Sequence, residues 1–309
     1  MSKEIEDKID TIPVLRHVVK PFKRVKLGFL QGMSLYELLE IYLLGVAEGA
    51  VTYRAAAIAF SFFMALFPFA LFVLNLVPFI PLEGFQNDFM KFVEESVPPN
   101  TYSAIFNILN DIMNNSHSGL LSSGFLLSIF VMANGVNSVL GGFETSHHVL
   151  VKRGFVRQYL VALAISLLLS VILIVTVSTI VVFEVFIQMT KIQDVLSDNI
   201  PILVWGRYVF VMLMILVTSS TLLKFGTKHT GKRSFISVGS VFTTILIIIS
   251  SYFFGIWVVK FAKYNQLYGS IGTLLILMFY IWLNCVILLL GFELNAAINR
   301  IKRKNLFTQ

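Results

Sequence analysis

The sequence predicts an all-α integral membrane protein with six transmembrane helices and with both termini in the cytoplasm. Hydrophobic residues make up 57% of the 309 residues and charged residues 13%, whereas soluble domains are about 45–50% apolar and about 25% charged. Several runs are uncharged over a length that can cross the roughly 30 Å of bilayer hydrocarbon. The first of them is residues 55–80. Lysine and arginine gather between these runs.

The chain begins with a charged segment, residues 1–32, which we expect to be a cytoplasmic leader. Residues 33–54 follow, with apolar residues at helical spacing and three glutamates largely elsewhere on the helical wheel. This segment is too charged to span a membrane, so we interpret it as an amphipathic helix at the cytoplasmic interface. A soluble amphipathic helix that packs on the helix bundle is the alternative.

Six predicted spans make up a membrane domain over residues 55–298. Their approximate ranges are 55–80, 119–143, 158–186, 199–223, 234–259 and 266–298. The longest connection, residues 81–118, is an outer loop whose pattern predicts two short amphipathic helices, at 85–97 and 102–113, separated by Pro98 and Pro99. The last span is long enough to tilt or to extend into the cytoplasm. A basic cytoplasmic tail, residues 299–309, ends the sequence.

The distribution of basic residues orients the six spans. The N-terminal region, the loops after spans two and four, and the C-terminal tail carry 19 of the 24 lysines and arginines, and the opposite side carries four. Because loops rich in lysine and arginine stay in the cytoplasm, both termini are predicted to be cytoplasmic. The same distribution explains the net charge of +7. The sequence lacks a basic surface with interleaved aromatic residues, which is the pattern typical of nucleic-acid binding, so we expect no nucleic-acid partner.

The sequence contains no pattern that predicts catalysis, a metal site or a cofactor. Its five histidines are scattered over both sides of the membrane, and the adjacent His147 and His148 point in different directions on a helix, which is a poor chelating geometry. There is no glycine-rich phosphate loop followed by lysine and no recognisable Ser/His/Asp set. We therefore expect that the protein is not an enzyme. The single Cys285 excludes an internal disulfide.

Polar residues on the spans mark a candidate transport path. Asn134 and Asn137 lie on the second span and Asn284 lies on the sixth, each within a stripe of small and polar residues. Such stripes let transmembrane helices approach closely and form hydrogen bonds between them, so helix packing is one interpretation. The other interpretation is that these asparagines line a polar cavity between helices.

The same path includes two ionisable residues, which are costly at membrane depth and are therefore functional candidates. Glu184 lies near the outer end of the third span, and Arg207 lies about two turns inside the outer end of the fourth span. Antiparallel neighbours would bring the two side chains to a similar depth, which predicts a buried or half-buried ion pair. Alternatively, both side chains extend to the outer interface.

A second group of polar residues predicts a gate at the cytoplasmic end. Glu293 lies toward that end of the sixth span, about 180° around the helix from Asn284. It could meet Arg54, Lys224 or the His147–His148 pair. The candidate cytoplasmic gate consists of Arg54, Glu144, Glu293 and Asn295.

Three stretches together resemble a known family. They are AAAIAFSFFMALFPF at 55–69, ANGVNSVLGGFE at 133–144, and YGSIGTLL at 268–275 leading to LLGFELNAA at 289–297. This sequence resembles the YihY/virulence factor BrkB family of bacterial inner-membrane proteins, long mislabelled as ribonuclease BN, over residues 35–300. The resemblance implies six spans with cytoplasmic termini and a location in the bacterial inner membrane. One departure is Ala133-Asn134, where an aromatic-small pair is expected, so Asn134 is either part of a family site or particular to this protein.

For function, the resemblance implies a transporter or a role in envelope lipids, with no settled substrate. The leading hypothesis is a transporter that moves a lipid or a small anionic solute across, or out of, the inner membrane. The rival hypothesis is a scaffold or assembly factor of the envelope that transports nothing. The expected partners are membrane lipids and, for a transporter, an anionic lipid or solute. A cavity between the spans would favour the transporter, and a tightly packed bundle would favour the scaffold.

Overall fold

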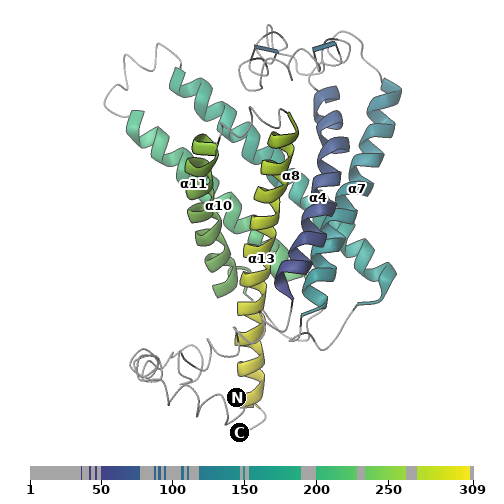
Figure 1. The fold of residues 1–309 in the computed structure, drawn as a ribbon, viewed down its shortest axis with the longest axis vertical. Coiled ribbons are helices and arrows are strands. Elements are labelled where there is room, and N and C mark those ends of the chain that lie inside the picture. Colours follow the sequence, from purple (N-terminus) through teal and green to yellow (C-terminus); the bar gives the residue numbers. More distant parts are fainter. Residues whose placement is uncertain are drawn as a thin grey trace.

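The computed structural model describes residues 51–76, 118–146, 153–188, 200–227, 234–261 and 270–306, together with single residues between them (36, 42, 46, 50, 87, 90, 91, 94, 106, 107, 110 and 149). Six long helices account for nearly all of these residues, and none of the described residues is in a strand. The helices are α4 (Val51–Leu76), α7 (Ser118–Glu144), α8 (Phe155–Gln188), α10 (Ile200–Phe225), α11 (Val238–Phe261) and α13 (Ser270–Leu306) (Figure 1).

The all-α class is therefore confirmed, and each long helix coincides with a predicted span to within several residues. Four helices contain segments that are long and apolar enough to cross a membrane: Phe155–Leu173, Trp205–Phe225, Val238–Val258 and Leu274–Arg300. Helix α4 contributes a shorter apolar segment, Val51–Phe67. The fold is that of a multi-pass membrane protein, while the count of six crossings and the cytoplasmic position of both termini stay predictions.

The start of α4 differs from the predicted boundary at residue 55. Ala50 has a φ of 46°, a left-handed conformation that ends any helix before it, and α4 begins at the next residue. Arg54 therefore belongs to the first turns of α4. Tyr36, Tyr42 and Val46 are helical. The rest of the predicted interfacial helix, the leader and most of the outer loop lie outside the described residues, so the structures proposed for them stay predictions.

The end of α13 also differs from the predicted boundary. The helix continues through residues 299–306, within the predicted tail. This stretch contains no proline or glycine, and its lysines and arginines lie where the negative end of the helix dipole favours them. In Figure 1, α13 extends beyond its neighbouring helices at the lower end.

The six helices are arranged in a ring. Each helix packs against the next one in chain order, and α13 returns to pack against α4. Contacts across the ring are few, between α10 and α13 and between α13 and α7. The core is built from the starts of α4, α8 and α11 and from the later parts of α7, α10 and α13. Neighbouring helices around the ring therefore run in opposite directions.

The core occupies one end of this ring, which we call the closed end. Nearly all the buried side chains that the structure describes lie there, and the largest include Ile58, Val136, Leu140, Phe143 and Leu289. Packing at this end joins α4, α7, α8, α10 and α13 into a single apolar cluster. Burial of such side chains is what holds the ring together at this end.

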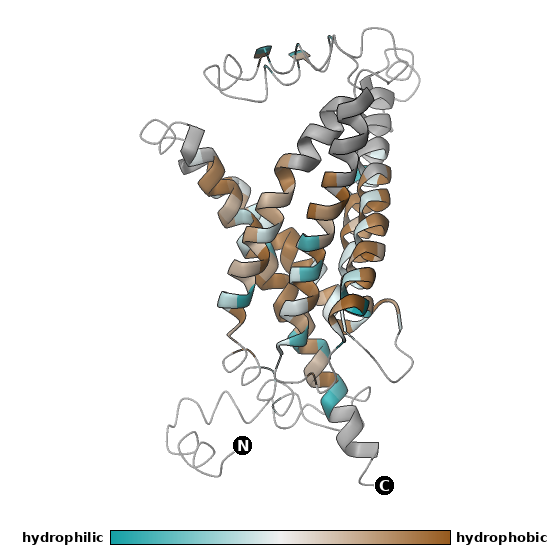
Figure 2. Cartoon of the chain, turned by 90° about the vertical axis from the view of Figure 1, so that its right-hand side faces the viewer, coloured by the Kyte–Doolittle hydropathy of each residue, from teal (hydrophilic) through white to brown (hydrophobic). Residues whose placement is uncertain are grey.

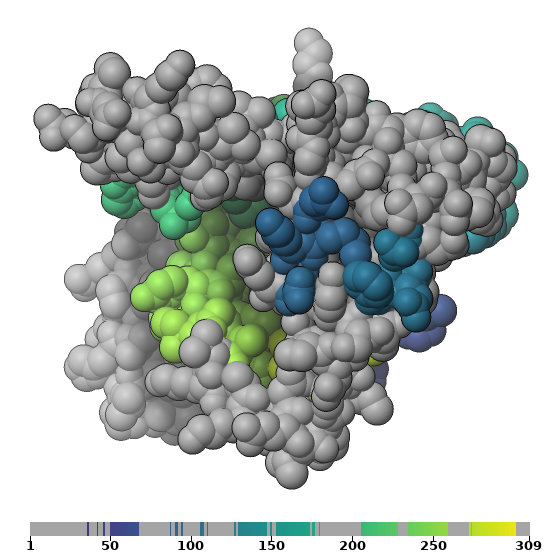
Figure 3. All heavy atoms as spheres, turned by 90° about the horizontal axis from the view of Figure 1, so that it is seen from above, coloured from purple at the N-terminus to yellow at the C-terminus, as the bar shows by residue number. Residues whose placement is uncertain are grey.

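The other half of the ring, which we call the open end, has few buried side chains among the described residues. Large apolar residues here are exposed on every helix, for example Phe130, Val171, Tyr208, Tyr252 and Leu275. Two groups of helices diverge toward this end in Figure 2, and most of the residues coloured there are hydrophobic. Seen from above, described side chains from the C-terminal half of the chain are visible at this end (Figure 3). Among the described residues, the buried side chains thus concentrate at the closed end.

Candidate functional site: a buried ion pair at the closed end

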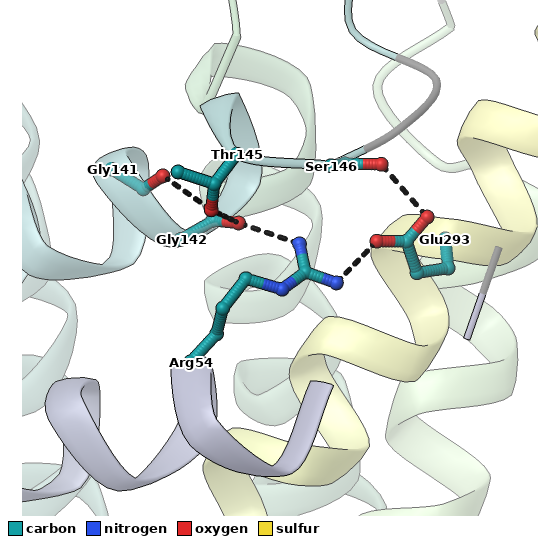
Figure 4. Close-up of polar contacts among 6 residues, drawn as sticks. All are labelled: Arg54, Gly141, Gly142, Thr145, Ser146 and Glu293. Atoms are coloured by element: carbon teal, nitrogen blue, oxygen red, sulfur yellow. Dashed lines mark hydrogen bonds and ion pairs between the residues drawn. The ribbon is translucent and has the colours of Figure 1, made fainter. Parts of the chain in front are cut away.

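A buried ion pair joins α4 to α13 at the closed end. Arg54 Nη2 donates to Glu293 Oε1 at 2.5 Å (Figure 4). The Arg54 side chain is 9% exposed and the Glu293 side chain is 0% exposed. Charges so far from water are expensive unless they are paired and hydrogen-bonded, so this pair is stable only while both partners are in place.

The end of helix α7 and the turn that follows it supply further hydrogen bonds to the two charges. Gly142 O accepts from Arg54 Nη1 at 2.7 Å, and Ser146 Oγ donates to Glu293 Oε2 at 2.8 Å. The Gly142 carbonyl lies at the C-terminal end of α7, where the helix dipole favours a positive charge. Three helices are therefore connected through one pair of side chains. We call Arg54, Gly142, Ser146 and Glu293 the three-helix clamp.

The packing around the clamp explains how α7 reaches it. A Cβ atom added to Gly142 would lie 2.7 Å from Ile58 Cδ1 and 3.6 Å from Leu289 Cδ2, so a larger residue here would require the end of the Ile58 side chain to move. Next to it, the rings of Phe143 and Phe292 stack with centroids 4.3 Å apart. The apolar contacts exclude water from the ion pair and fix the side chains that carry it.

Tyr42, which precedes α4 in the chain, lies close enough to the clamp to interact with Glu293. Its half-buried ring packs edge-on against Phe242 with centroids 6.5 Å apart. Burial raises the pKa of Tyr42 to about 12, and the negative charge of Glu293 adds to the increase. The phenol therefore stays protonated and uncharged at physiological pH. Any negative charge on Tyr42 would repel the Glu293 carboxylate.

A second arginine connects α7 to α10 at the same end. Arg153, in the connection between α7 and α8, donates from Nη2 to Phe225 O at 2.8 Å and from Nη1 to Gly226 O at 3.2 Å. Its backbone N–H donates to Glu144 Oε1 at 3.3 Å. Burial lowers the pKa of Arg153, and the charge of Glu144 opposes this decrease. Arg153 thus binds the C-terminal carbonyls of α10, in the same way that Arg54 binds α7.

Helices α11 and α13 cross closely beside the clamp. Asn295 Oδ1 accepts from the Gly239 N–H at 2.8 Å, and Asn295 Nδ2 donates to Ser237 Oγ at 2.8 Å. A Cβ added to Gly291 would overlap Thr243 Oγ1 and would lie 2.8 Å from Gly239 O. The two backbones are therefore nearly in contact, and Asn295 satisfies a backbone donor at the start of α11.

The four predicted gate residues thus lie at the same end of the ring, in three different environments. Glu293 pairs with Arg54, one of the partners considered from the sequence. Lys224, another such partner, lies instead over the rings of Phe225 and Phe235, 5.5 Å and 5.4 Å from their centroids. Glu144 contacts Arg153, and Asn295 contacts α11. Whether any of them acts as a gate stays a prediction.

The predicted transport-path residues are separated from the clamp. Asn284 Nδ2 donates to Tyr280 O of its own helix at 2.8 Å. Asn134 and Asn137 are half-buried on α7. The bond that joins α7 to α4 here runs between the hydroxyls of Ser138 and Ser61, 2.8 Å apart.

Arg207 is half-buried on α10, with its guanidinium 5.5 Å from the ring centroid of Tyr208. Glu184 lies in α8, but its side chain is outside the part that the structure describes. The predicted pair between Glu184 and Arg207 therefore stays a prediction.

Several residues of the clamp and its neighbours were not predicted from the sequence. Ser146 and Arg153 lie in the short connection after α7, where the sequence shows only a polar turn. The crossing glycine Gly239 is likewise a lone glycine near the start of a span. A partial signal existed for the α13 side of this crossing, because Gly291 and Asn295 lie along the same predicted helix face as Asn284.

Comparison with known proteins identifies the family. A family model described as virulence factor BrkB matches residues 44–308. The chain belongs to this family. The match confirms the resemblance inferred from the sequence motifs, and it covers all six long helices together with the three-helix clamp.

Some relatives of this BrkB family member are named after a ribonuclease, and others are named only as membrane proteins. YfkH of Bacillus subtilis (strain 168), whose name describes it as ribonuclease-like, is 29% identical over 81% of this chain and 90% of its own length. A UPF0761 membrane protein of Coxiella burnetii (strain RSA 493 / Nine Mile phase I) is 24% identical over 79% of this chain and 86% of its own. Another, of Kangiella koreensis, is 23% identical over 77% of this chain and 57% of its own. No solved structure matches the chain.

The chemistry of the described residues was also compared with what a metal site needs. Among them, no group of three or more histidine, cysteine, aspartate or glutamate side chains is placed to hold a metal ion. The charged groups at the closed end are instead an ion pair and an arginine on backbone carbonyls. This arrangement holds helix ends together.

Proposed function

We propose that this BrkB family protein is a transporter of the bacterial inner membrane that moves a lipid or a small anionic solute across, or out of, the membrane. The observation that carries the proposal is the asymmetry of the ring, which is tightly packed at one end and diverges at the other. A ring of helices that is packed at one end and diverges at the other is the arrangement expected for one of the two states that alternating access requires.

In the proposed mechanism, the three-helix clamp is the cytoplasmic gate. The distribution of basic residues between the spans favours a cytoplasmic closed end, and in this proposal the open end faces the outside or the outer leaflet. To open the closed end, Arg54 and Glu293 must separate and become hydrated. Packed helices exchange between discrete arrangements by such rigid-body movements.

The alternative function is an envelope scaffold or assembly factor that transports nothing. A scaffold requires no change at the closed end, so its clamp would serve stability alone. The two hypotheses therefore differ in what happens when the clamp is replaced by a pair that packs well but cannot become hydrated.

The test is flux in proteoliposomes with the double variant Arg54→Met/Glu293→Met. Two methionines of similar length are expected to preserve folding, because a buried ion pair can be replaced by apolar residues at little cost. The two methionine side chains are apolar and gain nothing from contact with water, so they keep the closed end shut. The transporter hypothesis therefore predicts that flux falls to the level of vesicles without protein. The probes are fluorescently labelled phosphatidylglycerol, for movement between leaflets, and radiolabelled inorganic phosphate, for solute uptake.

The matched control is Arg157→Ala, which removes an exposed positive charge near the start of α8 at the same end. It is expected to retain the flux of the unmodified protein. If the double variant is folded and still transports either probe at the unmodified rate, the clamp is not the gate. If the unmodified protein moves neither probe, the scaffold becomes the better account.

A further inference from the structure

The guanidinium of Arg54 is incompletely satisfied. Its planar fork carries five N–H donors and matches a carboxylate or phosphate through two parallel hydrogen bonds. Glu293 accepts from Arg54 through one carboxylate oxygen, Oε1, because its other oxygen, Oε2, accepts from Ser146. Arg54 Nε is buried and has no hydrogen-bond partner among the residues that the structure describes.

An unpaired N–H on a buried charged group costs free energy, so its presence calls for an explanation. Bidentate binding of an acid to arginine can use the edge formed by Nε and Nη2. In this protein Nη2 of that edge binds Glu293, and Nε is left without a partner. The edge is therefore half used in the closed state, while the remaining side, through Nη1, is fixed to Gly142 O.

We infer that Arg54 is an oxyanion-binding residue, and that a phosphate or carboxylate group of the substrate replaces Glu293 on its Nε–Nη2 edge when the closed end opens. This inference rests on the proposed transport function and adds the substrate's charge and the residue that recognises it. Glu293 then acts as the internal anion that neutralises Arg54 when no substrate is bound.

Replacement of Glu293 by a substrate anion on Arg54 explains how a buried charge can be part of a gate. Arg54 is paired with an anion in both states, so its guanidinium is never buried without a counter-charge, and the released Glu293 carboxylate becomes hydrated as the end opens. A neutral or cationic solute cannot compete with Glu293 for the guanidinium. The other arginine at this end, Arg153, is bound to the carbonyls of Phe225 and Gly226 and is not placed to substitute.

The variant Glu293→Gln tests the exchange, because glutamine preserves the shape of the site. Its oxygen can accept from Arg54 and its amide can donate to Ser146, so only the negative charge is lost. We measure the thermal unfolding midpoint of the purified full-length protein in nanodiscs of phosphatidylcholine. Glu293→Gln is expected to unfold several degrees below the unmodified protein, and an added oxyanion is expected to restore most of that loss.

Two probes distinguish the sources of the oxyanion. Inorganic phosphate added to phosphatidylcholine nanodiscs reports a soluble anion, and nanodiscs with phosphatidylglycerol report a lipid headgroup. Restoration by either probe supports the inference, provided that chloride at the same ionic strength does not restore the midpoint. The double variant Arg54→Gln/Glu293→Gln, which lacks the guanidinium, is expected to gain nothing from either probe.

The inference is overturned if neither probe stabilises Glu293→Gln more than it stabilises the unmodified protein. It is also overturned if the double variant responds as strongly as Glu293→Gln, because the anion then binds elsewhere. These outcomes are separate from those of the flux assay. Restoration by an anion without any flux leaves the oxyanion site in place and rejects transport, whereas flux without restoration rejects the oxyanion site alone.

Discussion

Replacing Glu293 with alanine is expected to lower the free energy of unfolding by about 3–5 kcal/mol, the usual cost of removing one member of a buried ion pair. The carboxylate is 0% exposed and its partner Arg54 is 9% exposed, so the remaining guanidinium has little access to water. Ser146 also loses its acceptor. The measurement is reversible unfolding of the detergent-solubilised protein in mixed micelles with increasing denaturing detergent.

The control for this prediction is again Arg157→Ala, which removes an exposed charge and is expected to change stability by less than about 1 kcal/mol. The double variant Arg54→Met/Glu293→Met is expected to recover most of the stability lost in Glu293→Ala, because no charge is left unpaired. If Glu293→Ala has the same free energy of unfolding as the unmodified protein, Glu293 is not buried against Arg54 in the folded state.

Gly291→Ala is expected to destabilise the protein by about 1–3 kcal/mol or more, through overpacking at the crossing of α11 and α13. The added methyl group would overlap Thr243 Oγ1 and press on the backbone carbonyl of Gly239, which cannot rotate away. This cost exceeds the gain of up to about 1 kcal/mol that alanine normally brings over glycine inside a helix. The unfolding assay described for Glu293 measures it.

Gly255→Ala on α11 is the matched control, because a Cβ at Gly255 would meet nothing within 4 Å. Here the helix-propensity gain is unopposed, so this variant is expected to be as stable as the unmodified protein or slightly more stable. Opposite effects at the two glycines support the close crossing. Equal effects at Gly291 and Gly255 would mean that the two helices are farther apart than the structure places them.

The fold could be predicted from the sequence because lipid leaves few alternatives. Long uncharged runs must be helical to satisfy their backbone groups, and the six runs found in the sequence coincide with the six long helices. The boundaries were less predictable. Ala50 is an ordinary helix former, and only its positive φ reveals that α4 begins after it. The last helix was expected to be long enough to extend into the cytoplasm, but the sequence does not show that it continues to Leu306, within the predicted tail.

The candidate site could be predicted only in part. Arg54 and Glu293 stood out because ionisable residues near apolar runs are costly, and their proximity followed from both lying near the same end. Their connection to Ser146 and to the carbonyl of Gly142 could not be predicted, because it depends on how closely α7 approaches. Which charges pair with which is set by side-chain packing between distant parts of the chain, and hydropathy carries no information about that packing.

The central claim is that the three-helix clamp holds one end of the ring closed. It is tested most directly by distances between spin labels in nanodiscs, in a Cys285→Ala background. One label pair replaces Tyr53 on α4 and Ser234 before α11, both exposed at the closed end. A second pair replaces Phe130 on α7 and Tyr252 on α11, both exposed at the open end.

In the unmodified clamp, each pair is expected to give one dominant distance. In Glu293→Gln the Tyr53–Ser234 pair should gain a longer distance, and the Phe130–Tyr252 pair should gain a shorter one, because opening of one end accompanies closure of the other. Arg157→Ala should leave both distributions unchanged. If Glu293→Gln also leaves both unchanged while the protein remains folded, the clamp does not control the ring, and the gate assigned to Arg54 and Glu293 is wrong.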